Sequence, residues 1–142
     1  MRYQIQKLEA SVWRDSFSEY AHKAVFNEEK PKDWDRIDYA LLITADDMPV
    51  AYVTCLETYS DTVHLQYAGV FPAAKDTIWS FKLFQAGIRY LKEDYARCFF
   101  YIKNTNSVAL KMAAKVGFLI TGLKNFHGDV LLEHLLEFNE SR

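Results

Sequence analysis

The chain has 142 residues, of which half are hydrophobic and a quarter charged, and its formal net charge is −2. This length and composition are typical of one soluble globular domain, which we expect to span residues 1–142. The small net charge gives no general attraction to nucleic acid, and the apolar runs are too short to span a bilayer. We therefore expect neither nucleic acid nor a membrane as a partner.

The N-terminal third of the chain predicts one strand and one helix. Tyr3–Leu8 alternates apolar and polar side chains, which is typical of a strand. Ser11 is the expected N-cap of the helix that follows, and residues 27–37 form a polar connection. The expected buried stripe of this helix is formed by Trp13, Phe17, Tyr20 and Ala24.

The middle of the chain predicts three antiparallel strands joined by short turns. Tyr39–Thr44 and Val50–Leu56 are rich in β-forming residues and flank the turn Asp46-Asp47-Met48-Pro49. A second turn, Thr58–Asp61, leads into the strand Thr62–Phe71. Alternation along this third strand predicts that one face carries Val63, Leu65 and Tyr67 and the other carries His64 and Gln66.

The last part of the chain alternates helices and strands. Asp76 or Thr77 is the expected cap of a long helix, and the strand Cys98–Ile102 should lie parallel to Thr62–Phe71 with both faces covered. A second helix spans about residues 106–115 and ends at Gly117. The expected buried stripe of the long helix is formed by Ile78, Phe81, Phe84, Ile88 and Leu91, and a hairpin of Phe118–Thr121 and Val130–Phe138 through His127-Gly128-Asp129 closes the chain.

The resulting order is β-α-β-β-β-α-β-α-β-β. It predicts an α/β (α+β) fold with a mixed, mostly antiparallel central sheet and helices on both faces.

Cysteine and histidine usage favours neither a disulfide framework nor a metal site. We interpret Cys55 and Cys98, each within an expected strand, as buried free thiols of a reducing compartment, which indicates a cytoplasmic protein. The four histidines lack zinc-site spacing, and neither CxxC nor HExxH occurs, so no metal is expected.

The segment 106–118, NSVALKMAAKVGF, resembles the signature of the GNAT acetyltransferases. Where most members of that family carry a tyrosine that reprotonates the thiolate of coenzyme A, this chain has Ala113. The predicted order of elements also looks like the GNAT fold, and in character the chain resembles short bacteriophage GNAT-like proteins. The residues at the matching offsets are Asn106, Ala109, Met112, Lys115, Gly117 and Phe118.

The resemblance implies acetyl-CoA or another acyl-CoA as cofactor. Its pantetheine arm would pass the strand end at Gly69 and Val70, although Gly69 is equally explained by relief of strand strain. The diphosphate loop falls at residues 75–80, where no glycine occurs and where Asp76 takes the first glycine position, so we expect weakened binding of coenzyme A. The implied cofactor-binding residues are Gly69, Val70, Lys75, Asp76, Thr77, Ile78 and Asn106.

Acyl transfer to an amine needs a base, an oxyanion donor and an acid. Gln66 lies where the resemblance implies a catalytic glutamate, and it cannot titrate. His64, two residues earlier, is a candidate base, with a polar side chain on an open sheet face as the plainer alternative. Tyr101 is a candidate substitute for the missing acid, and packing explains it equally well.

Two functions remain open at this point. One is a GNAT-type N-acyltransferase, diverged and of reduced activity, which acts on a small-molecule or protein amine. The alternative is a non-catalytic GNAT-fold module for binding or assembly, with a protein partner or a second copy of the chain, and virion-associated if the protein comes from a phage. The aromatic content, including Trp34 and Trp79, favours the alternative.

Overall fold

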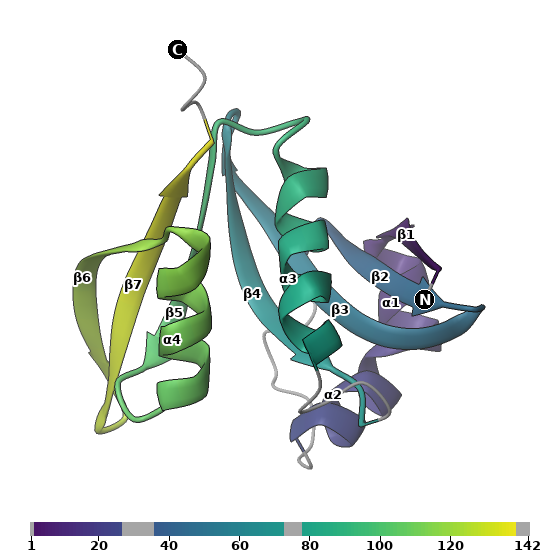
Figure 1. Cartoon of the computed structure of the whole chain (residues 1–142), viewed down its shortest axis with the longest axis horizontal. Helices are drawn as coiled ribbons and strands as arrows, with labels where there is room; N and C mark the ends of the chain where they lie inside the picture. Colours follow the sequence, from purple (N-terminus) through teal and green to yellow (C-terminus); the bar gives the residue numbers. More distant parts are fainter. Residues whose placement is uncertain (1, 27–35, 73–77, 139–142) are drawn as a thin grey trace. The chain divides into compact units, whose positions relative to one another are not determined.

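The computed structural model describes residues 2–26, 36–72 and 78–138. Within these ranges the chain forms seven strands and four helices (Figure 1). The elements in chain order are β1 (Tyr3–Glu9), α1 (Ala10–Ser16), α2 (Ser18–Phe26), β2 (Tyr39–Ala45), β3 (Met48–Tyr59), β4 (Thr62–Val70), α3 (Ile78–Leu91), β5 (Arg97–Lys103), α4 (Ser107–Val116), β6 (Leu119–Phe126) and β7 (Asp129–Glu137).

The strands form one sheet in the order β1-β2-β3-β4-β5-β7-β6. β4 and β5 pair in parallel, as the sequence predicts for a strand–helix–strand connection. The β1–β2, β2–β3, β5–β7 and β6–β7 pairs are antiparallel. The predicted mixed, mostly antiparallel sheet of an α/β fold is therefore confirmed.

The chain divides into two compact units, and β4 contributes residues to both. The first unit holds residues 1–56 and 66–90, and the second holds residues 57–65 and 91–142. The expectation of one domain over residues 1–142 stays a prediction.

The predicted single N-terminal helix is wrong, because the structure forms two helices with a break at Phe17. Phe17 has φ −130°, outside the helical region, and closes α1 by donating its backbone N–H to the Trp13 carbonyl. At the next residue, the Ser18 hydroxyl donates to the Arg14 carbonyl at 2.7 Å, so the side chain takes the acceptor that the backbone N–H would use.

The start and the buried stripe of the first helix also differ from the prediction. α1 begins at Ala10, directly after β1, and Glu9 precedes it without a side-chain cap, so Ser11 is not the N-cap. Trp13 is fully buried, whereas Tyr20 is 64% exposed even though its ring stacks on Phe71. The stripe therefore faces the sheet mainly through Trp13, whose ring lies 4.9 Å from that of Tyr52.

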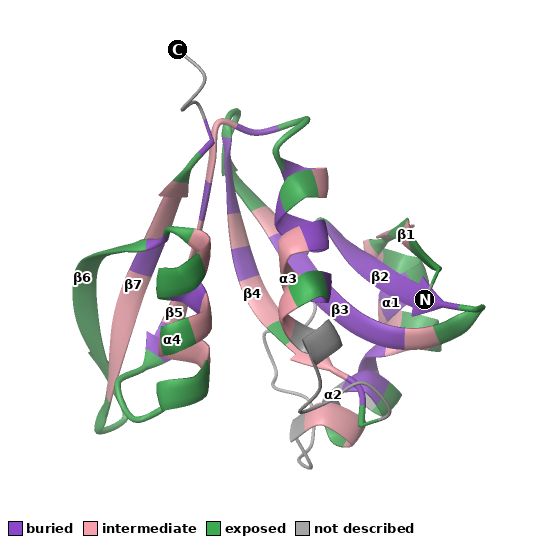
Figure 2. Ribbon diagram, in the orientation of Figure 1, coloured by how far each residue is buried: buried purple, intermediate pink, exposed green. Residues whose placement is uncertain are grey.

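The core of the first unit lies on both faces of β2, which is buried along its whole length (Figure 2). On one face, Ala40 and Leu42 join Trp13 in a cluster with Tyr52 and Phe71. On the other face, Ile43 and Ala45 pack with Leu83 of α3. Leu83 replaces Phe81 and Phe84 at the centre of the α3 stripe, because these phenylalanines are only half-buried while Ile88 and Leu91 are buried as predicted.

Both predicted hairpin turns are present, and both are tighter than expected. Asp46 and Asp47 have φ values of 50° and 68°, and His127 and Gly128 have 53° and 88°. Positive φ at both central residues is typical of a two-residue type I′ turn. Met48 and Pro49 therefore belong to β3, and Asp129 opens β7.

In the second unit, α4 matches the prediction closely. Asn106 is its N-cap and accepts the Ala109 N–H through its side chain at 3.2 Å, and Gly117 ends the helix at φ 115°. The ring of Phe100 packs edge-on against that of Phe118, with the ring centroids 4.7 Å apart. Cys98 is buried and is not in a disulfide, and the same holds for Cys55 in the first unit.

The prediction that β5 is covered on both faces is wrong. Its alternate residues Phe99 and Tyr101 are only half-buried and line a pocket, whereas Phe100 on the other face packs against Phe118 at the end of α4. This face of β4, β5 and β7, which carries Phe99 and Tyr101, is called the open face below.

Candidate functional site

Register places three rows of side chains across the open face. His64 lies opposite Phe99 in the β4–β5 ladder, and Phe99 lies opposite Leu135 in the β5–β7 ladder. Tyr101 lies opposite Glu133 in the same way. Directly opposed residues project to the same face of a sheet, so these side chains are neighbours. The third row consists of Thr62, Arg97 and Glu137.

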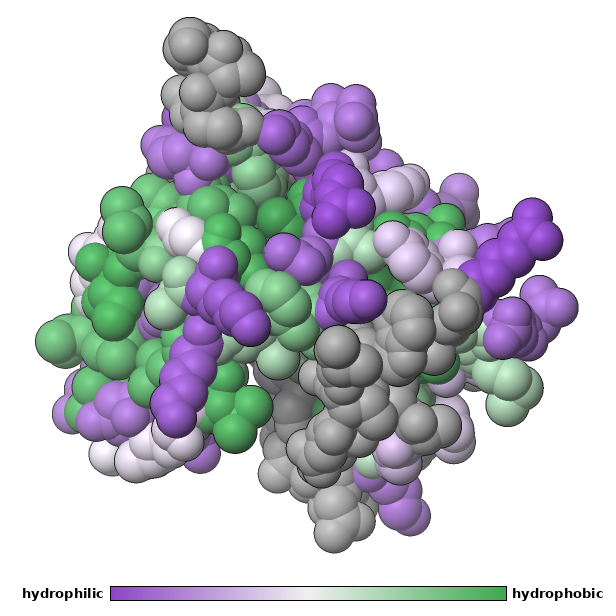
Figure 3. All heavy atoms as spheres, viewed as in Figure 1, coloured by the Kyte–Doolittle hydropathy of each residue, from purple (hydrophilic) through white to green (hydrophobic). Residues whose placement is uncertain are grey.

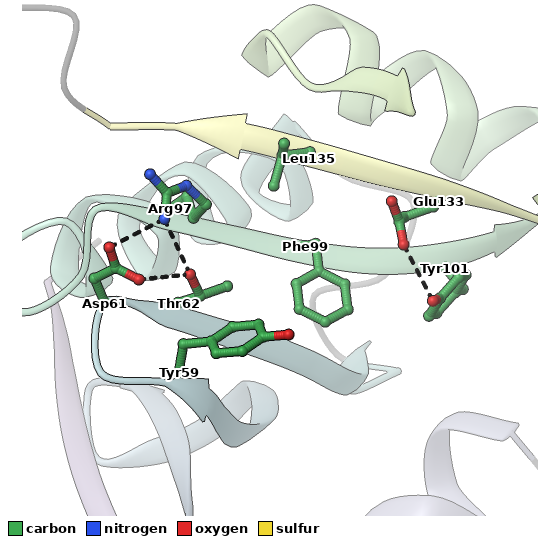
Figure 4. A pocket seen from close by; sticks show the side chains of 8 residues that line it. All are labelled: Tyr59, Asp61, Thr62, Arg97, Phe99, Tyr101, Glu133 and Leu135. Carbon is green, nitrogen blue, oxygen red and sulfur yellow. Dashed lines mark hydrogen bonds and ion pairs between the residues drawn. The ribbon is translucent and has the colours of Figure 1, made fainter. Parts of the chain in front are cut away.

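A shallow, open pocket of about 560 Å³ lies over these rows (Figure 4). Its wall combines aromatic rings with carboxylates and one guanidinium group, and ligand pockets commonly have such an apolar lining with a few polar groups. The lining residues are Tyr59, Asp61, Thr62, Arg97, Phe99, Tyr101, Glu133 and Leu135.

His64 is held by aromatic neighbours on the open face. Its ring stacks on Phe99, with centroids 4.6 Å apart and planes at 4°, and meets Tyr101 edge-on at 5.7 Å. Burial lowers the pKa of His64 to about 4, Lys124 adds to this effect, and Glu133 opposes it. The imidazole is therefore uncharged at neutral pH and can accept a proton.

Tyr101 and Glu133 form a hydrogen-bonded pair. The Tyr101 hydroxyl donates to Oε2 of Glu133 at 3.2 Å (Figure 4), and the Thr121 hydroxyl donates to Oε1 at 2.6 Å. Desolvation raises the pKa of Tyr101, and Glu133 raises it further. The structure thus brings the candidate base His64 and the candidate acid Tyr101 together, but the phenol proton of Tyr101 is directed at Glu133.

A positive charge already lies against this pair. Nζ of Lys124 is 4.6 Å from the centroid of the Tyr101 ring and 5.7 Å from that of Phe126. Both distances are within the range of cation–π attraction. The Tyr101 ring therefore accommodates a primary ammonium group.

Arg97 is neutralised by acids at the other end of the pocket. It lies 2.6 Å from Oε1 of Glu137 and 3.1 Å from Oδ2 of Asp61, and it donates to the Thr62 hydroxyl at 3.2 Å. The hydrogen bond from Thr62, followed by those with Arg97, lowers the pKa of Asp61. Arg97 is thus committed to neighbours within the protein.

Gln66 lies two residues beyond His64 along β4, and it belongs to the first unit. Its side-chain Oε1 is buried and has no hydrogen-bond partner among the described residues. A buried carbonyl oxygen without a donor is costly, so this atom fits a ligand that supplies an N–H group.

The residues of the implied cofactor site have varied surroundings. A Cβ added at Gly69 would lie 2.5 Å from Cγ1 of Val25, so α2 fills the space beside this glycine. Val70 packs against the core of the first unit, and Asn106 caps α4. Lys75, Asp76 and Thr77 lie outside the described residues, as does Trp34, and Ile78 is the first residue of α3.

Ala113, at the position of the family tyrosine, is fully buried. Its carbonyl accepts the backbone N–H groups of Gly117 and Phe118, which close α4. The position therefore serves packing and helix termination in this chain.

Sequence reasoning missed Glu133, Thr121 and Lys124. One signal was present, since Glu133 interrupts the apolar run of β7 and a charged residue inside such a strand indicates a specific partner. Thr121 could not be placed by counting, because the β6–β7 register shifts between Ile120 and Gly122.

Two features are absent from the described ranges, a membrane-spanning helix and a metal-binding cluster. No helix there is both long and apolar enough to cross a membrane. No group of three or more His, Cys, Asp or Glu side chains there is arranged to hold a metal ion.

Comparison with known proteins relates the chain to others by structure. No protein-family model matches it, and no curated protein does. Among solved structures, the ribosomal-protein-S18-alanine N-acetyltransferase of Escherichia coli matches with a TM-score of 0.77 and 13% identity, covering 96% of this chain and 94% of its own. A GNAT family acetyltransferase of Elizabethkingia anophelis with acetyl-CoA bound matches with a TM-score of 0.74 and 13% identity, covering 95% of this chain and 97% of its own.

A third match is a chimeric spermidine N-acetyltransferase derived in part from Vibrio cholerae, with a TM-score of 0.77 and 12% identity over 99% of this chain and 98% of its own. Identities this low show a shared fold rather than a shared activity. The chain therefore has the fold of the GNAT acetyltransferases.

Proposed function

We propose that the protein is a GNAT-type N-acyltransferase that uses acetyl-CoA or another acyl-CoA and acts on an amine. The main support is the open face, where an uncharged imidazole, a phenol and a carboxylate lie together in a chain with the GNAT fold. The similar structures include enzymes named for amine acceptors, a protein alanine and spermidine.

His64 is the proposed base. An amine must lose a proton to become nucleophilic, and the uncharged His64 imidazole offers a nitrogen that accepts it. Its pKa of about 4 makes it a weak base, which agrees with the slow turnover expected below. The Phe99 ring fixes the plane of His64 by stacking, and Glu133 provides a negative charge that favours the imidazolium once it forms.

An acyl-CoA would supply an activated thioester. The buried Oε1 of Gln66 fits such a ligand, because the amide N–H groups of its pantetheine arm are donors of the kind that this atom lacks. The Cβ position of Gly69 faces Val25, which favours the packing explanation for this glycine, and a contact of its backbone with the cofactor stays a prediction.

We expect activity below that of family members with the usual tyrosine. The phenol of Tyr101 is bonded to Glu133, and Ala113 supplies no acid. Loss of one general acid typically lowers the rate by ~10²–10⁴-fold, so slow turnover is expected rather than none.

The proposal is tested by incubating the protein with acetyl-CoA and a panel of amines and identifying acetylated products by mass spectrometry. Product should form faster than without protein, and His64→Phe, which keeps the stacking on Phe99, should lower the rate at least tenfold. Absence of product with every amine, or unchanged activity in His64→Phe, would contradict it.

A second candidate function is the non-catalytic binding or assembly module, cytoplasmic or virion-associated. One observation favours it: all eight residues of β6 are exposed. Figure 3 shows apolar side chains gathered over the part of the second unit that holds β6 and α4. An exposed strand with large apolar side chains is a common pairing surface. The apolar residues of β6 are Leu119, Ile120, Leu123 and Phe126, which are 52–70% exposed.

A further inference from the structure

The environment of the Lys124 ammonium group indicates what the open face can bind. This group lies over the Tyr101 ring, on a strand whose residues are all exposed. An exposed lysine usually extends into water, since its charge is strongly hydrated. Its position here shows that the face of Tyr101 attracts a primary ammonium group.

Glu133 has capacity for one more donor. A carboxylate offers about four acceptor positions. The partners of Glu133 in the described part of the chain are two neutral hydroxyl groups, those of Tyr101 and Thr121. Among the described residues no direct ion pair neutralises its negative charge, so the carboxylate is available to an incoming ammonium group.

The rest of the pocket favours a cation with an apolar chain. Arg97 pairs with Asp61 (Figure 4) and also with Glu137, so its charge does not repel a cation. Phe99 and Leu135 are half-buried and offer apolar surface between the two ends of the pocket. The volume of about 560 Å³ lies within the range of small-molecule pockets.

We propose that the open face binds a primary alkylammonium group against Tyr101 and Glu133, and that Lys124 is a built-in occupant that this ligand displaces. The alkyl chain lies along Phe99 and Leu135, and the N–H groups donate to Glu133. A quaternary ammonium group can make the cation–π contact with Tyr101 but has no N–H group to donate to Glu133, so it binds less well. The identification of this amine as the acyl acceptor rests on the proposed function, whereas the binding itself does not.

Nuclear magnetic resonance titration with n-butylammonium chloride tests the proposal, with tetramethylammonium chloride as the matched cation at equal ionic strength. The amide signals of Tyr101, Thr121 and Glu133 should shift with n-butylammonium and shift less with tetramethylammonium. Lys124→Met removes the internal competitor and should tighten binding about two- to five-fold. Glu133→Gln should weaken it at least five-fold, and Lys111→Met, on the exposed surface of α4, should leave it unchanged.

Equal binding of the two cations, or unchanged affinity in both Lys124→Met and Glu133→Gln, would overturn the proposal. If Glu133→Gln does not fold, the affinity of Lys124→Met for n-butylammonium decides alone, and an unchanged affinity overturns the proposal. Butylammonium binding without any acyl transfer supports this site and contradicts the proposed enzyme. Acyl transfer to an alkyl amine at an unchanged rate and KM in Glu133→Gln supports the enzyme and contradicts this site.

Discussion

His64 should make the stability of the protein depend on pH. Its pKa is about 4 in the folded protein and near 6.5 without the fold, so the unfolded chain binds more protons between these values. The free energy of unfolding should therefore fall as pH drops from 6.5 to 4, by about 1–3 kcal/mol, with no further change from this group below pH 4.

Chemical denaturation at several pH values measures this effect. His64→Phe should flatten the slope between pH 6.5 and 4. His127→Asn is the matched control, because His127 is exposed in a turn with positive φ that asparagine also adopts. An unchanged slope in His64→Phe would show that the imidazole is not held uncharged by its surroundings.

Gly69 gives a second prediction for a single residue. Gly69→Ala should destabilise the protein by about 1–3 kcal/mol, because the added methyl group would lie 2.5 Å from Val25 and 3.1 Å from Tyr52. In the double variant with Val25→Ala the cost of Gly69→Ala should largely disappear. Strictly additive free energies of unfolding in this double-mutant cycle would disprove the packing role.

At the scale of one element, α4 should depend on both of its caps. Asn106→Ala should cost about 1 kcal/mol of stability, because the Ala109 N–H loses its acceptor. Gly117→Ala should cost at least as much, because its φ of 115° is unfavourable for alanine. Thermal unfolding measures both changes, with exposed Asn104→Ala as the control. If Asn104→Ala lowers the stability as much as Asn106→Ala does, the capping explanation is wrong.

Sequence patterns predicted the elements where local chemistry is decisive. α4 has an asparagine cap, an apolar stripe and a terminal glycine, and its predicted end at Gly117 is confirmed. The split at Phe17 was missed, because the apolar spacing continues through it while the Ser18 hydroxyl interrupts the backbone ladder. The open face of β5 was missed for a similar reason, because a short apolar run does not reveal how many of its faces are covered.

The candidate site was predicted only in part. His64 and Tyr101 were chosen from separate strands, and the register brings them together. The positions of Glu133 and Lys124 in the site depend on the pairing of β7 with β5 and β6. The bulge in β6 shifts this register, so the pairing cannot be obtained by counting residues along the sequence. Roles that depend on residues 73–77 stay predictions.

At the scale of the whole molecule, the expectation of one domain can be tested directly. β4 runs without interruption from Thr62 to Val70, and the first unit takes its later residues while the second takes its earlier ones. A shared strand should couple the two units, so scanning calorimetry should give one transition whose calorimetric and van't Hoff enthalpies agree. Two resolved transitions would show that the units unfold independently.

The central claim is that this GNAT-fold chain binds an acyl-CoA, and calorimetric titration with acetyl-CoA and with free coenzyme A tests it most directly. Residues 75–80 lack the glycines of the GNAT diphosphate loop, so we expect weak binding. The heats should be saturable, with a dissociation constant for acetyl-CoA between about 10 μM and 1 mM, which corresponds to a binding free energy of roughly 4–7 kcal/mol. Gln66→Leu should weaken this binding by removing the unpaired buried oxygen. No heat of binding with either compound at millimolar concentration would contradict the claim and leave the fold without the function proposed for it.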